Sequence, residues 1–106
     1  MKSRRTQARL AIATELLTSH EQVQWGYELS QRAGVGAGSM YPFLAELLVA
    51  GHLKDGWESQ PPGGRPPRRH YTVTDSGIDF LREFVASAPS GARGRAEVFR
   101  PGVVQP

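Results

Sequence analysis

The sequence lacks the residues and segments on which several large classes of protein depend. It contains no cysteine, which excludes disulfides, thiolate metal sites and cysteine nucleophiles and fits a reducing, cytoplasmic location. No apolar run approaches the roughly 18 residues that span a bilayer, and no apolar signal segment follows the charged start. The histidines lie in separate segments, and no metalloprotease, serine-hydrolase or phosphate-loop motif is present. We therefore expect no enzymatic activity, no metal and no cofactor.

The positive charge is modest in amount but uneven along the chain. Thirteen lysines and arginines oppose ten acidic residues, for a net charge of +3, and 39% of the residues are hydrophobic. These proportions predict one folded domain. The cations gather near the start, in a loop rich in proline and glycine, and near the end. We expect a folded domain over residues 1–88 and a flexible basic tail over residues 89–106.

Three helices are predicted in the first half of the chain from apolar residues that recur at helical spacing. They cover residues 6–19, 25–33 and 38–50, and each carries apolar side chains along one side. The glycine-rich run that begins at Gly34 predicts a tight turn between the second and third helices. Pro42 is expected in the first turn of the third helix, where its missing N–H leaves no helical hydrogen bond unmade. The helices over residues 25–33 and 38–50, with the turn between them, predict a helix-turn-helix.

Two short strands and a last helix are predicted in the second half. Residues 52–57 and 70–74 favour strands, and residues 71–74 alternate in polarity. The intervening residues 58–69 hold four prolines and two glycines, so they predict an exposed loop. Thr74 is expected to cap a helix that runs to Ala88, with Asp75 in its first turn. The predicted fold class is therefore mainly α with a small two-stranded β-hairpin.

Four stretches of the sequence resemble the PadR family of bacterial transcriptional regulators. They are Gly26-Tyr27-Glu28-Leu29, Ser39-Met40-Tyr41-Pro42-Phe43-Leu44, Gly51-His52-Leu53 and the run from Gly63 to Gly77. The resemblance covers roughly residues 8–85 and implies a winged helix-turn-helix protein that binds double-stranded DNA as a homodimer. It also implies that the third helix enters the major groove while the loop over residues 58–69, the wing, lies along the backbone or the minor groove. We expect a transcriptional repressor.

The residues expected to contact DNA come from the outward side of the third helix and from the wing. They are Ser39, Tyr41, Pro42, Arg65, Arg68 and Arg69. Guanidinium groups on a proline-stiffened loop can neutralise phosphates or enter a narrow minor groove. Residues 37–50 hold no Arg, Lys, Asn or Gln, so the side chains that read guanine and adenine by paired hydrogen bonds are absent. Backbone and shape are therefore expected to carry most of the affinity.

Five further residues have both a functional and a purely structural interpretation. Arg5 and Arg32 either touch the DNA backbone or are ordinary exposed residues of helical segments. Trp25, Tyr27 and Phe43 are expected in the core, because large aromatic residues at helical spacing pack inward more often than they bind a ligand.

Dimerisation is expected through the first and fourth helices, because the helical pattern stops near residue 88 whereas many PadR-like proteins continue. The expected interface residues are Leu10, Leu17, Phe80, Phe84 and Val85. The resemblance also leaves room for a small aromatic effector between the subunits, although no residue pattern establishes one. Two alternatives stay open: a winged-helix adaptor that binds proteins, and a DNA-binding factor for replicon partition or phage control.

Overall fold

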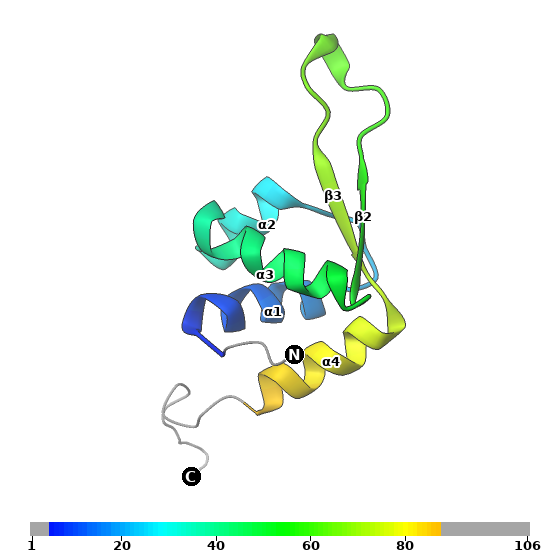
Figure 1. The fold of residues 1–106 in the computed structure, drawn as a ribbon. Helices are drawn as coiled ribbons and strands as arrows, with labels where there is room; N and C mark the ends of the chain where they lie inside the picture. The colour runs from blue at the N-terminus through cyan, green and yellow to red at the C-terminus, as the bar shows by residue number, and fades with distance from the viewer. Residues whose placement is uncertain (1–4, 88–106) are drawn as a thin grey trace.

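Residues 5–87 fold into four α-helices and a small antiparallel sheet (Figure 1). These are the residues that the structure, a computed structural model, describes; the tail expected over residues 89–106 lies outside them. In chain order the elements are α1 (Gln7–Thr18), β1 (Gln24–Trp25), α2 (Gly26–Ala33), α3 (Ala37–Val49), β2 (Leu53–Trp57), the short 3-10 turn η1 (Pro62–Gly64), β3 (Arg69–Val73) and α4 (Asp75–Ala86). The predicted class, mainly α with a small β-hairpin, is confirmed. No helix in this range is long and apolar enough to cross a membrane.

The strands β2 and β3 form the predicted hairpin, and β1 adds a third strand that the sequence pattern did not reveal. The strand order is β1-β3-β2, all antiparallel, with Gln24 opposite Tyr71 and Trp25 opposite His70. A strand of two residues is too short to show an alternation of polar and apolar side chains. The pairing holds Trp25 in an extended conformation, at φ −89° and ψ 137°. The prediction that Trp25 opens the second helix is therefore wrong by one residue.

The helix ends follow the capping residues that the sequence offers. The hydroxyl of Thr6 accepts from the backbone N–H of Arg9 over 3.1 Å at the start of α1. The hydroxyl of Thr74 accepts from the N–H of Gly77 over 3.1 Å at the start of α4, as predicted. Gly34 ends α2 in the left-handed conformation, at φ 68°, where a residue with a side chain would be strained.

Pro42 lies inside α3, which corrects the prediction that it marks the first turn. The helix begins at Ala37, five residues before the proline, with Gly36 as its N-cap. Pro42 therefore lacks the N–H that would bond to the carbonyl of Gly38 in a regular helix. The predicted start at residue 38 was one residue late, because the glycine-rich run resembled a turn, and from either start Pro42 lies beyond the first turn of the helix.

The helices share one core, and the hairpin projects beyond them (Figure 1). In Figure 1, α1 lies between α3 and α4, while α2 lies beside α3 on the side of the hairpin. Phe43 of α3 and Phe84 of α4 meet in the core, with ring centroids 5.3 Å apart. The fully buried large side chains are Ile12, Leu16, Leu29, Met40, Phe43, Leu44, Leu47, Tyr71 and Leu81. As a result, the outward side of α3 and the hairpin are neighbouring surfaces, and both are exposed to solvent.

Candidate nucleic-acid interface

A cleft between the hairpin, α2 and α3 brings together residues that the sequence analysis assigned to DNA contact. Its volume is about 410 Å³, and its walls are Trp25, Gly26, Tyr27, Glu28, Tyr41, Arg68 and Arg69. Tyr41 comes from the helix expected in the major groove, and the two arginines come from the wing and β3. A duplex that touched α3 here would therefore also meet cationic side chains of the hairpin. We call this hollow the wing cleft.

Tyr41 is held at the wing cleft by its close approach to α2. Its side chain is exposed, and its hydroxyl lies so near Gly26 that a Cβ at that position would be 2.6 Å from the Tyr41 oxygen. Gly26 therefore makes room for the phenol. Below it, the phenol of Tyr71 is buried, and this burial raises the pKa of Tyr71 above its ordinary value. Tyr41, in contrast, is 40% exposed, so its side chain is open to a ligand in the cleft.

Arg65 braces the wing instead of projecting freely from it. Its guanidinium donates to both carboxylate oxygens of Glu58, over 2.8 and 2.9 Å. These hydrogen bonds hold the pKa of Glu58 below its ordinary value, with a smaller contribution from the backbone N–H of Arg68. The pair links the start of the proline-rich loop to the residue that follows η1, so its main effect in the free protein is to fix the shape of the wing.

Arg69 is fixed at the side of the wing cleft by an ion pair and by aromatic rings. It donates to Asp55 on the neighbouring strand, and this hydrogen bond raises the pKa of Arg69. The guanidinium carbon lies 5.6 Å from the ring centroids of both Trp57 and Tyr71. Stacking of this kind restrains the plane of the guanidinium group without using up all of its N–H donors.

Arg68 is the most loosely held of the wing arginines. Its guanidinium group lies 3.7 Å from a carboxylate oxygen of Glu28 in α2, and the two side chains are 53% and 46% exposed. The other carboxylate oxygen of Glu28 is buried and has no hydrogen-bond partner within residues 5–87. The sequence does not indicate this role of Glu28, because its proximity to Arg68 depends on how α2 packs beside the hairpin.

Ser39 and Pro42 lie on the outward side of α3, toward α1. Both are exposed, and they share a shallow hollow of about 310 Å³ with Thr6, Ala8, Arg9 and Gly38. Two positions along a helix correspond to a turn of about 200°, so Ser39 and Tyr41 flank the outward side from opposite edges. A groove-filling ligand would meet Ser39, Pro42 and Tyr41 together only by lying across this side of α3.

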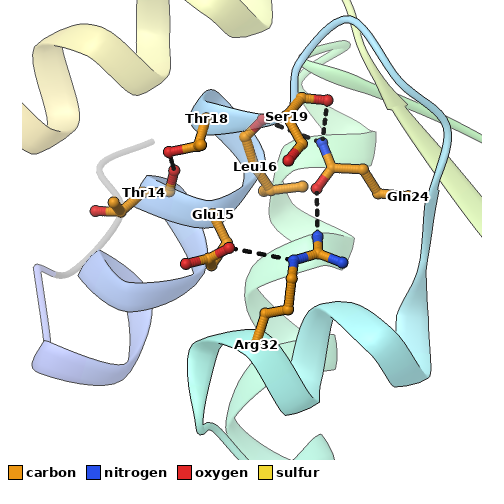
Figure 2. A network of polar contacts seen from close by, with 7 residues as sticks. All are labelled: Thr14, Glu15, Leu16, Thr18, Ser19, Gln24 and Arg32. Carbon is orange, nitrogen blue, oxygen red and sulfur yellow. Dashed lines mark hydrogen bonds and ion pairs between the residues drawn. The ribbon is translucent and has the colours of Figure 1, made fainter.

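Arg32 is engaged in a structural network away from the wing cleft (Figure 2). It donates to Glu15 over 3.2 Å and to the side-chain oxygen of Gln24 over 3.3 Å. The amide nitrogen of Gln24, which is only 2% exposed, donates in turn to the carbonyls of Leu16 and Ser19, both over 3.1 Å. Gln24 thereby satisfies the carbonyl of Leu16 in the last turn of α1, and it adds a second hydrogen bond to the carbonyl of Ser19, which also accepts from the N–H of Gln22. The network ties α2 to α1.

Arg5 also lies apart from the wing cleft. Its guanidinium carbon is 5.4 Å from the ring centroid of Phe84 in α4, and Phe84 contacts Phe43 on the buried side of α3. The structure therefore places Arg5 beside α4. Of the residues expected to contact DNA, the structure brings Tyr41, Arg68 and Arg69 to the wing cleft.

The aromatic residues expected in the core divide into two groups. Phe43 is fully buried, as predicted, and Trp25 is half-buried with its ring centroid 5.1 Å from that of His70. The prediction is wrong for Tyr27, which is 68% exposed at the wall of the wing cleft. Tyr27 is the second residue of α2 and lies on the side of this helix that faces Arg68 and Arg69 of the hairpin. Trp57 is also exposed, at the base of the wing.

The helix pair α2–α3, the hairpin and α4 together define a winged helix-turn-helix protein. The model of the PadR-like family of transcriptional regulators matches residues 15–83, and the chain belongs to this family. Because these proteins are regulators, the expectation that the chain is not an enzyme is confirmed. No curated protein matches the chain. Within residues 5–87, no group of three His, Asp or Glu side chains could hold a metal ion.

Solved structures of similar proteins support the same fold. A PadR family transcriptional regulator from Eggerthella lenta is 30% identical, with 74% of this chain and 72% of that chain covered and a TM-score of 0.58. A PadR-like transcription factor from Bacteroides fragilis is 28% identical, with 76% and 81% covered and a TM-score of 0.59. The protein smu.1704 from Streptococcus mutans is 22% identical, with 93% and 100% covered and a TM-score of 0.62.

Proposed function

We propose that this chain binds double-stranded DNA in the cytoplasm and represses transcription. In this proposal the outward side of α3 enters the major groove, and the hairpin lies on the adjacent backbone or minor groove. One observation carries the proposal: Tyr41 of α3 and the hairpin residues Arg68 and Arg69 line the same cleft. Cationic groups on one surface with the helix-turn-helix are what a polyanion requires.

The proposed interface contains the wing cleft together with Ser39, Pro42 and the wing residue Arg65. Arg65 reaches a phosphate by sharing donors between Glu58 and the ligand, because a guanidinium group has five N–H donors. Arg5 and Arg32 are left out, since one lies beside α4 and the other is bonded to α1 and Gln24. Affinity then comes mainly from phosphate contacts and the shape of the duplex.

Fluorescence anisotropy with duplex DNA at rising salt tests this function. The double substitution Arg68→Ala/Arg69→Ala is expected to weaken binding and to make the slope of log K against log salt shallower by about 1 to 2 units for each bound subunit. Arg5→Ala/Arg82→Ala removes the same charge from the side of α4 and is expected to leave the slope within about half a unit of wild type. If the wild type and the wing variant gave equal slopes, the proposed DNA binding would be wrong, and the alternative of an adaptor that binds proteins would be favoured.

We also propose that the protein acts as a homodimer through α1 and α4. Half-buried apolar residues lie on these helices, packed against the edge of the core; they are Leu10, Leu17, Phe80 and Val85. Phe84, also expected there, is 2% exposed and forms part of the subunit core, so we omit it. Light scattering at micromolar concentration is expected to give twice the mass of one chain. The mass of a single chain would contradict paired half-site binding.

A further inference from the structure

The outward side of α3 carries an apolar stripe formed by Pro42, Ala45 and Val49. These residues are spaced by three and four positions, so they share one side of the helix. All three are exposed, Val49 to 85%, while the buried residues of α3 point into the core. At 1.5 Å per residue the stripe is about 10 Å long, or about three base-pair steps of B-DNA.

The stripe is free of charge because the acid of α3 is turned away from it. Arg9 of α1 donates to both carboxylate oxygens of Glu46, over 3.0 and 2.6 Å. The guanidinium carbon of Arg9 also lies 5.0 Å from the ring centroid of Phe43, which anchors the pair against the core. Since α3 holds no Arg, Lys, Asn or Gln, it offers no side chain that reads guanine or adenine by paired hydrogen bonds.

Cationic side chains beside the stripe favour a nucleic acid over an apolar protein as its occupant. Tyr41 borders the stripe on the side of the hairpin, where Arg68 and Arg69 line the same cleft. An apolar protein surface placed there would take the guanidinium groups and their partners Glu28 and Asp55 out of water and add no new anion, at a high desolvation cost. A duplex instead presents phosphates to the arginines and base edges to the stripe.

We propose that the apolar stripe recognises DNA by the C5-methyl groups that thymine presents in the major groove. This inference rests on the proposed DNA-binding function and names the feature of the duplex that α3 reads. The methyl is the apolar group on the major-groove edge of a standard base pair. 5-Methylcytosine offers the same group. The preferred ligand is therefore duplex DNA in which each half-site places C5-methyl groups opposite Pro42, Ala45 and Val49.

The test compares duplexes that differ only in the methyl group. Anisotropy is measured with alternating d(A-T) and d(A-U) duplexes of equal length, and with alternating d(G-C) and d(G-5-methyl-C) duplexes. The methylated member of each pair is expected to bind about fourfold more tightly for each methyl buried. The salt slopes within a pair are expected to be equal, because the phosphates are unchanged.

A substitution in the stripe separates methyl recognition from phosphate binding. Val49→Ser is expected to reduce the preference for thymine over uracil by about fourfold and to leave the salt slope unchanged. Val23→Ser makes the same change at another exposed valine, before β1, and is expected to keep the full preference. Equal binding of the T and U duplexes, or a preference that survives Val49→Ser, would overturn methyl recognition while DNA binding stands. Failure to bind any duplex would overturn the proposed function and this inference with it.

Discussion

Replacing Gly77 with alanine is expected to destabilise the protein, although alanine is the better helix former. Gly77 is buried in the first turn of α4, and a Cβ there would overlap the carbonyl oxygen of His52 and lie 2.9 Å from the carbonyl carbon. The same carbonyl accepts from the backbone N–H of Thr74 over 3.1 Å. Because the obstacle is backbone, α4 must shift or this bond must break. We expect a loss of about 2 to 4 kcal/mol in the free energy of unfolding, against a helix-propensity gain of about 1 kcal/mol.

Urea unfolding followed by circular dichroism measures this change, with Gly38→Ala as the matched control. Gly38 is also a helical glycine, but a Cβ there meets no atom within 4 Å. Gly38→Ala is therefore expected to raise the free energy of unfolding by up to about 1 kcal/mol. If Gly77→Ala were as stable as wild type, α4 would not be pressed against the corner between α3 and β2.

Local sequence signals were sufficient to predict most of the fold. The spacing of apolar residues predicted the helices, and the hydroxyl of Thr74 and the αL-tolerant Gly34 predicted two of their ends, because these signals act within one turn of the chain. The strand β1 escaped prediction because it consists of two residues, and its conformation is set by pairing with β3, far along the chain.

The sequence predicted the cationic residues of the wing cleft but not the acidic residues that pair with them. Arg68, Arg69 and Tyr41 could be named because the resemblance covers their motifs. Glu28 and Asp55 could not be assigned, since an ion pair between residues on different elements depends on tertiary packing. The same limit applies to Arg32, whose interaction with Gln24 is visible only once α1, β1 and α2 are in place (Figure 2).

Removing the negative charge of Glu28 is expected to tighten DNA binding, provided that the proposed function holds. Glu28 is the acid in the wall of the wing cleft, and one of its oxygens lies 3.7 Å from the guanidinium of Arg68. In the free protein this carboxylate competes with phosphate for Arg68. In the complex it would stand near the DNA backbone, where like charges repel. Glu28 therefore opposes binding in both states.

Glu28→Gln keeps the shape of the side chain and removes its charge. We expect an affinity for duplex DNA about tenfold higher at low salt, which corresponds to about 1.4 kcal/mol, with a smaller gain at high salt because exposed charges are screened. Fluorescence anisotropy over a salt series measures both values. The gain should exceed that of Glu83→Gln, which makes the same change at an exposed residue of α4.

A double-mutant cycle shows whether Glu28 acts through Arg68 or only through its overall charge. If Glu28 restrains Arg68, the gain from Glu28→Gln must shrink in the Arg68→Ala background, because no guanidinium is left to release. If Glu28 acts only by repelling the duplex, the two effects will add. Unchanged or weaker binding by Glu28→Gln, in a protein whose wild type binds DNA, would mean that the carboxylate positions Arg68 for the phosphate instead of competing with it. The cycle thus tests the contact between α2 and the hairpin, on which the combined α3 and wing surface depends.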